Sequence, residues 1–165
     1  MEIPETPRSP KESEVVMTEL VLPGDGNALG TAFGGKVMQW IDTAAAIAAI
    51  RHTRKVVVTA SMDELHFHKP IKVGEVVQIH ARVNAVFHRS LEVGVEVFSE
   101  DPLTGRRNHT CSALLTFVAL DAEGRPTTVP PLLLETQEER DLQAAAEARR
   151  AQRLANRRRT APRET

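Results

Sequence analysis

Several features that mark particular protein classes are missing from this chain. Its single cysteine, Cys111, lies in an apolar run and cannot form an intramolecular disulfide, so we expect a buried structural thiol in a reducing compartment. No stretch approaches the roughly 18 uninterrupted apolar residues of a membrane span. The formal net charge of -1 gives no chain-wide attraction to nucleic acid or membranes. We therefore expect a cytoplasmic protein that binds neither.

Motifs for several kinds of site are missing too. No G-x-S-x-G elbow supplies a serine nucleophile. Gly24, Gly26 and Gly30 could be mistaken for a dinucleotide loop, but the strand and helix alternation of a βαβ unit does not follow them. His66 and His68 share one face of a strand, as two metal ligands would, yet no cysteine or third histidine stands near them in a recognisable motif. We expect no metal and no organic cofactor.

The 165 residues suit one domain with one core. Residues 1–13 combine prolines and alternating charges with almost no apolar side chain, which predicts a disordered lead-in. The folded domain is predicted for residues 14–130. Residues 131–165 are rich in Ala, Arg and Glu, which predicts a C-terminal helix and tail. Because the helix lacks a strong apolar stripe, it is either solvated or in contact with an anionic ligand or a neighbouring subunit.

The rest of the chain shows one long helix signal among strand signals. Residues 35–52 contain good helix formers without interior Gly or Pro, and they are apolar nearly all round, which predicts an enclosed helix. Strands are predicted at 15–22, 56–68, 77–85, 91–97 and 108–120. The last of these is more evenly apolar and suits a sheet centre. This order favours an α+β fold, an antiparallel sheet curled round one long buried helix, over a doubly wound fold.

The candidate chemistry lies at the start of that helix. Gly34 and Gly35 leave backbone N–H groups unshielded, and these donors with the helix dipole form a site for a developing oxyanion. Asp42 follows Gly35 by about two helical turns, so it projects on the same side. A carboxylate in an apolar helix is costly unless it is paired, solvated by a cleft or functional. On these residues alone, a structural and a catalytic aspartate both remain open.

Three segments carry a resemblance to a known family. They are N-A-L-G-T-A-F-G-G-K-V-M-Q-W-I-D at 27–42, K-P-I-K-V-G-E at 69–75 and H-R-S at 88–90. With these segments in the family's order and approximate spacing, the chain resembles the hotdog acyl-CoA thioesterases of the YciA and brain acyl-CoA hydrolase type over about residues 14–120. The resemblance implies a hotdog fold and hydrolysis of acyl-CoA to a carboxylic acid and free CoA, so that CoA is part of the substrate and not a cofactor.

The resemblance also implies catalytic roles for individual residues. Asp42 would activate a water or attack the thioester directly. Asn27 would orient the water or the substrate from the neighbouring subunit. Gly35, together with Gly34, would bind the thioester carbonyl oxygen through backbone N–H groups. A thioester can be hydrolysed by these few groups, because a thiolate leaves without the general acid that an amide's leaving amine requires.

Further positions are implied as substrate contacts. The family commonly has His where Phe33 stands, and F-G-G places the chain with the YciA-like group, so Phe33 would line the acyl or pantetheine path. Arg89 and Ser90 match positions that approach the CoA moiety, and Lys69 is a second candidate for its phosphates. Each of these three residues could equally be an ordinary exposed turn residue.

The resemblance also concerns assembly, and two alternative activities remain open. The resemblance implies a dimer in which two sheets pair edge to edge, with a trimer of dimers as a larger form. A hotdog dehydratase or hydratase is one alternative, although that chemistry needs a His paired with an acidic residue at the helix and the first His after Asp42 is His52. The other alternative is a non-catalytic acyl-CoA sensor that uses the same cleft.

Overall fold

A curled antiparallel sheet carries one long helix on each face. The computed structural model describes residues 5–157. The five strands lie in the order β1-β3-β4-β5-β2, and every neighbouring pair is antiparallel. The strands are β1 (Val15–Leu20), β2 (Val56–Phe67), β3 (Val76–Val86), β4 (Ser90–Glu100) and β5 (Arg107–Leu120), and the helices are α1 (Gly34–Thr53) and α2 (Gln137–Arg157). The predicted α+β class and the sheet curled round one helix are confirmed.

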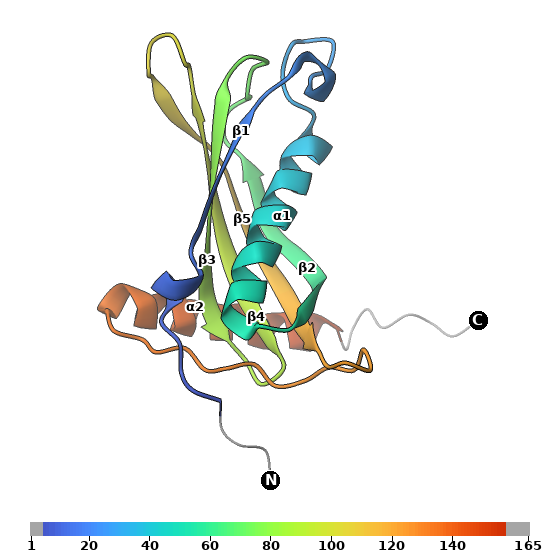
Figure 1. Cartoon of the computed structure of the whole chain (residues 1–165), viewed down its shortest axis with the longest axis vertical. Helices are drawn as coiled ribbons and strands as arrows, with labels where there is room; N and C mark the ends of the chain where they lie inside the picture. Colours follow the sequence, from blue (N-terminus) through green and yellow to red (C-terminus); the bar gives the residue numbers. More distant parts are fainter. Residues whose placement is uncertain (1–4, 158–165) are drawn as a thin grey trace, which may run out of the picture.

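Helix α1 covers the face of the sheet that we call the inner face (Figure 1). Alternate residues of β3, β4 and β5 point to it, and Leu91, Leu115 and Phe117 are at most 1% exposed there. From the helix, Ile41 and the alanines at 44, 45 and 48 are fully buried, because small side chains let the helix approach the strands closely. The other side of α1 is partly exposed in the single chain, so the helix is buried against the sheet and not covered on every side.

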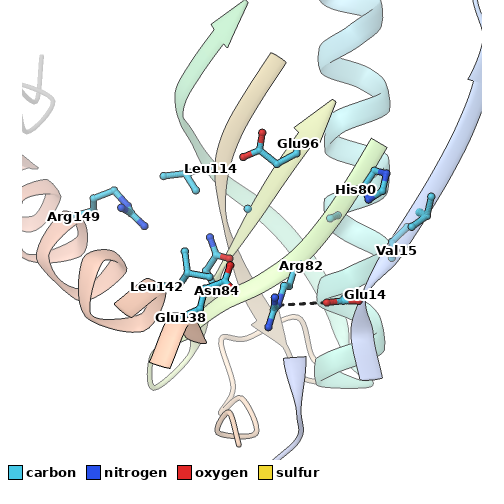
Figure 2. Close-up of a pocket in the computed structure, with 13 residues that line it drawn as sticks. Glu14, Val15, His80, Arg82, Asn84, Glu96, Leu114, Glu138, Leu142 and Arg149 are labelled. Atoms are coloured by element: carbon cyan, nitrogen blue, oxygen red, sulfur yellow. Dashed lines mark ion pairs between the residues drawn. The ribbon is translucent and has the colours of Figure 1, made fainter. Parts of the chain in front are cut away.

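Helix α2 lies against the opposite, outer face, near one end of the sheet (Figure 1). Glu92 of β4 is only 1% exposed and accepts two bonds from Arg149, at 3.1 Å from Nε and 2.6 Å from Nη2. Figure 2 shows the guanidinium groups of Arg82 and Arg149 near this face, and Arg82 donates to Glu139 at 2.7 Å. The solvated-helix alternative is therefore wrong, because charged pairs rather than an apolar stripe hold α2 to the sheet.

The carboxylate of Glu139 illustrates how this docking works. It lies at the start of α2 and is 2% exposed. The backbone N–H groups of Glu135 and Thr136 donate to it at 2.7 Å and 3.1 Å. The bond from Glu135 lowers the pKa of Glu139 most, and the bond from Thr136 and the charge of Arg82 lower it further, although burial opposes the shift. The carboxylate thus stays ionised at neutral pH, as the ion pair requires.

The first described residues are ordered, contrary to the predicted disordered lead-in. Pro10–Ser13 form a 3₁₀ turn capped by Ser9. The backbone of Arg8 donates to Pro131 at 3.0 Å and accepts from Leu133 at 2.8 Å. The prediction is wrong for residues 5–13, because backbone hydrogen bonds rather than apolar burial fix them. Residues 1–4, and residues 158–165 of the predicted tail, lie outside the described part of the chain.

Strand β2 forms one edge of the sheet and is open to solvent. Val56, Val58 and Phe67 on it are 66%, 45% and 50% exposed. Its pairing with β5 shifts register between Thr59 and Ser61 and again between Asp63 and His66. Such irregularities bend an edge strand and redirect its side chains. The edge nevertheless presents exposed apolar side chains at its two ends and backbone groups that no described strand pairs, which favours strand pairing.

Candidate active site

Asp42 is held by a side chain of the edge strand. It lies in the third turn of α1 and is half-buried, and Thr59 Oγ1 donates to its Oδ1 at 2.8 Å. Thr59 pairs with Phe117, so both point to the inner face, where α1 lies. The bond orients the carboxylate. Sequence reasoning missed Thr59, because only the spatial register between α1 and β2 brings it to Asp42.

The start of α1 offers unshielded backbone donors. The helix begins at Gly34, and Phe33, its N-cap residue, makes no side-chain capping bond. The amides of Gly34 and Gly35 precede the first N–H group that can bond within an α-helix, so they point out of the helix start. A Cβ on Gly35 would meet nothing within 4 Å, and one on Gly34 would meet only Phe67 Cζ, at 3.7 Å. Packing within the chain therefore does not require either glycine.

A cavity of about 350 Å³ lies beside these amides. Gly34, Phe67 and Lys69 are among the residues that line it. Lys69 Nζ donates to Asn108 at 3.0 Å, which holds the ammonium group at this end of the sheet. Phe33, predicted to line the substrate path, is 53% exposed next to Gly34. The structure thus brings Gly34 and Lys69 together at one cavity, with Phe33 beside it.

Asn27 organises the loop before α1. Its Oδ1 accepts from the backbone N–H groups of Leu29 and Thr31, at 3.0 Å and 3.2 Å, and its Nδ2 donates to Thr31 Oγ1 at 3.0 Å. All the side-chain bonds that Asn27 makes to described residues stay inside this loop. Within one chain the structure does not bring Asn27 to Asp42.

Arg89 lies in the turn between β3 and β4 and Ser90 is the first residue of β4, both far from the start of α1. The turn is at the bottom of the sheet in Figure 1, whereas α1 starts near the top. Ser90 pairs with Val118, one residue after Phe117, so its side chain points to the outer face. Within one chain, Arg89 and Ser90 are therefore separate from Asp42, and only contacts between chains could join them.

His66 and His68 lie near the end of β2. Their rings are 6.4 Å apart, and the ring of His109 lies 5.0 Å from that of His68. Among residues 5–157, no group of three or more His, Cys, Asp or Glu side chains could hold a metal ion. Neither described helix is long and apolar enough to span a membrane.

The chain is similar to known proteins over most of its length. Residues 29–105 match the thioesterase superfamily model. The chain is 48% identical over 139 residues to the uncharacterized acyl-CoA thioester hydrolase YkhA of Bacillus subtilis, a match that covers 84% of this chain and 80% of YkhA. It is 42% identical to acyl-coenzyme A thioesterase 11 of Mus musculus over 86% of this chain. That match spans only 24% of the mouse protein.

Solved structures agree with these matches. The crystal structure of an apo-hexameric acyl-CoA thioesterase superposes with a TM-score of 0.87 at 40% identity, covering 96% of this chain and 99% of the other. Acyl-CoA hydrolase from Staphylococcus aureus, solved in complex with butyryl-CoA and CoA, gives a TM-score of 0.83 at 39% identity over 91% and 92% of the two chains.

Proposed function

Since this chain belongs to the thioesterase superfamily, among its acyl-CoA thioester hydrolases, we propose that it hydrolyses acyl-CoA with Asp42 as the catalytic carboxylate. The family and the hotdog fold predicted from the sequence are confirmed. The observation that carries the catalytic assignment is the placement of Asp42. Asp42 lies two helical turns beyond the unshielded amides, and Thr59 orients its ionisable side chain.

The residues of this chain suffice for a balanced hydrolysis. Asp42 removes a proton from water as the water oxygen attacks the thioester carbon. In the alternative route the Asp42 oxygen attacks that carbon, and loss of CoA leaves a mixed anhydride between Asp42 and the acyl group. Water then hydrolyses the anhydride, which releases the carboxylic acid, restores the Asp42 carboxylate and leaves a proton for the CoA thiolate. The carbonyl oxygen becomes an oxyanion at the amides of Gly34 and Gly35. The C–S bond then breaks and CoA leaves as a thiolate, which needs no protonated side chain because a thiol is a far stronger acid than an amine. The scheme requires no metal and no organic cofactor.

Variants of one relative support this assignment. The Staphylococcus aureus hydrolase has been solved with a single aspartate, asparagine or threonine replaced by alanine. Along that chain, the three residues are separated by 15 and 17 positions, the same intervals that separate Asn27, Asp42 and Thr59 here. We propose that these three side chains form the catalytic set, with Phe33 and Lys69 beside the substrate.

The dehydratase alternative is less well supported. That chemistry needs a histidine beside the acid, whereas the side-chain partner of Asp42 is Thr59. His52 lies at the far end of α1, where it is 1% exposed and bonded to Pro130. The sensor alternative is separated from the enzyme by measuring turnover.

We test the catalytic assignment with Asp42→Asn and Asp42→Ala. Each variant should lower kcat by on the order of 10²-fold or more, because the base or nucleophile is lost. Release of CoA is followed with a thiol reagent over several acyl chain lengths, and circular dichroism checks the fold. Glu123→Gln, in the turn after β5, is the matched control and should retain wild-type kcat. Near-normal kcat in both Asp42 variants would move the chemistry elsewhere, and activity lost to a chelator and restored by zinc would overturn the metal-free scheme.

We also propose how the chain assembles and where it is located. The exposed apolar edge of β2 suits pairing with β2 of a second chain, and the apo-hexameric relative supports a trimer of such dimers. Asn27 of one chain would then serve Asp42 of the other, since one chain does not join them. The matched mouse, rat and human relatives named cytosolic support a cytoplasmic location.

Mixing subunits tests the shared site. Asn27→Ala and Asp42→Ala chains are unfolded and reassembled together, so that about half of the dimers contain one chain of each kind. Each mixed dimer then has one site without either mutation, and roughly a quarter of wild-type activity should return. If mixed dimers form, as shown by differential tags, and no activity returns, the site belongs to a single chain.

A further inference from the structure

A cavity of about 440 Å³ lies on the outer face of the sheet, against the first half of α2 (Figure 2). Leu142 of α2 lines one side of it, and Gly94 and Glu96 of β4 line the side formed by the sheet. These two residues alternate along β4 with Glu92, which is bonded to α2, so they lie on the outer face. Asp42 lies across the sheet. The cavity is therefore separate from the candidate active site of the same chain.

An irregularity of β3 brings Asn84 to this cavity. The register between β3 and β4 shifts between Val83 and Ala85, which makes Asn84 the extra residue of a β-bulge. A bulge redirects a side chain, and bulges occur often beside functional sites. Asn84 lines the cavity as a result.

Gly94 makes room for the Asn84 amide. A Cβ at Gly94 would lie 2.5 Å from Nδ2 of Asn84, which is closer than real Cβ atoms come to another heavy atom. A glycine inside a strand weakens the strand, and one reason to keep it there is the close approach of another group. Any side chain at this position would have to displace the amide.

The amide that the bulge and the glycine accommodate has no partner. Asn84 is 8% exposed, and its side chain makes no hydrogen bond to the other residues of 5–157. A buried amide in this state costs free energy that a bound ligand would recover. His80 adds a second such group, because it lines the same cavity and its Nε2 is buried without a partner among the described residues.

The charge around the cavity is negative. Figure 2 shows three carboxylates around it, those of Glu14, Glu96 and Glu138. Two guanidinium groups also line it, but Arg82 is bonded to Glu139 and Arg149 to Glu92. Both of these partners are buried carboxylates that lie outside the cavity lining. The positive charges are therefore already compensated, and the three cavity carboxylates favour a cation.

One of the three carboxylates is available for a ligand. Glu14 lies 3.5 Å from Nε of Arg82, and Glu96 is bonded to His109. Glu138, in the first turn of α2, makes no ion pair with the described part of the chain. Apolar side chains, among them Leu114, line the cavity between these groups. They suit the methylene groups of an aliphatic chain.

We propose that this cavity binds an organic cation, a primary amine or a guanidinium group carried on an aliphatic chain. The carboxylates of Glu138 and Glu96 accept charge-assisted bonds from the cation, and Oδ1 of Asn84 accepts a further one. The volume lies in the usual range for small-molecule sites. The cation can come from two sources. One is a free amine, and the other is a Lys or Arg side chain of a neighbouring copy of this chain.

Binding of putrescine, agmatine and spermidine to the full chain is measured by calorimetry. The double variant Glu96→Gln/Glu138→Gln should weaken the best of these ligands by about tenfold or more, since charge-assisted bonds are lost. Glu147→Gln removes a charge from α2 outside the cavity and is the matched control, which should keep wild-type affinity. The uncharged 1,4-butanediol should not bind. Equal weakening in the control would overturn the proposal, because the amines would then be held by the overall charge alone.

Asn84→Leu separates a ligand contact from a structural role. The variant keeps the size of the side chain and removes the unpartnered amide, so its melting temperature without ligand should equal or exceed that of wild type. Its affinity for the same amine should fall about threefold to tenfold. A lower melting temperature with unchanged affinity would show that the amide serves the fold and would remove it from the site.

The oligomeric state identifies the source of the cation. If the cation is a free amine, the double variant should keep the mass of the wild-type assembly in light scattering and lose only amine binding. If a neighbouring chain supplies it, no amine should bind wild-type protein, and the double variant should form a smaller assembly. Wild-type protein that binds no amine, together with an assembly that the double variant leaves unchanged, would overturn the proposal.

Discussion

The two faces of the sheet hold their helices by different physical means. On the inner face, α1 buries Ile41 and its alanines against strand side chains such as Phe117, so the attachment is hydrocarbon packing. On the outer face, the buried residues of α2 are Glu139 and Ala146. Charged pairs provide the attachment, two of them with a buried carboxylate, Arg82–Glu139 and Arg149–Glu92, and a third, Arg153–Asp63, nearer the surface. Packing tolerates gradual change, whereas a buried ion pair fails when either partner is lost. On the inner face, a mutation should therefore lower the free energy of unfolding in proportion to the side chain that it removes. On the outer face, loss of either partner of a charged pair should lower it sharply.

The largest effect is expected from truncating the inner-face core. Phe117 is 1% exposed, and Phe117→Ala should lower the free energy of unfolding by about 3–5 kcal/mol, because it removes a buried ring and leaves a cavity. Urea denaturation measures the change. Val118→Ala, at the next residue on the partly covered outer face, should cost about 1 kcal/mol or less. Equal losses in the two variants would contradict the difference between the faces.

A somewhat smaller effect is expected from breaking the outer-face pair. Arg149→Met leaves the carboxylate of Glu92 buried and uncompensated, which should cost about 3 kcal/mol, the lower end of the range for broken buried pairs, since Arg149 is itself partly exposed. The double variant Glu92→Leu/Arg149→Met should recover most of this loss in the same denaturation measurement. A double variant no more stable than the single one would show that α2 is held by something other than the charge pair.

The smallest effect concerns a titratable group enclosed at the end of α1. His52 Nε2 donates to the Pro130 carbonyl at 2.8 Å, and its Nδ1 is buried without a partner among the described residues. Burial lowers the pKa of His52; Arg8 adds to the shift, whereas the bond to Pro130 and the charges of Glu12 and Glu5 oppose it.

The sign of the pH effect follows from that shift. The folded pKa lies below the unfolded value, so the stability contributed by neutral His52 is complete above about pH 6.5 and is lost as pH falls through the folded pKa. The free energy of unfolding, measured from pH 8 to 5, should therefore decline less steeply in His52→Gln than in wild type. Parallel curves would show that His52 does not titrate differently in the folded chain.

The inner layer could be predicted from the sequence because its signals are periodic. The alternation in β3 and β4 and the breaker-free run of α1 fix which side chains meet, and Asp42 at its distance from Gly35 follows from helix geometry. The outer layer could not be predicted. Alternating polar residues such as Glu92 look the same whether water or a charged helix covers them, and α2 has no apolar stripe to reveal its docking.

The candidate site divides in the same way. The Gly34–Asp42 segment is local in sequence, so its arrangement could be predicted. Thr59 reaches Asp42 only through the position of α1 on the sheet. Ser90 points to the outer face because of strand register, and Arg89 lies in the turn before it. Their relation to Asp42 depends on how chains assemble, which sequence periodicity does not encode.

The backbone hydrogen bonds between Arg8 and residues 131–133 affect how the chain folds during synthesis. Arg8 and residues 131–133 are separated by most of the described sequence. The edge strands also pair with strands that come later in the sequence, β1 with β3 and β2 with β5. Contacts between residues so distant in sequence form late and slow folding. On the ribosome, Arg8 has no partner until residues 131–133 have been synthesised. The apolar edge strands of the nascent chain must therefore be kept from aggregating until their distant partners have been synthesised.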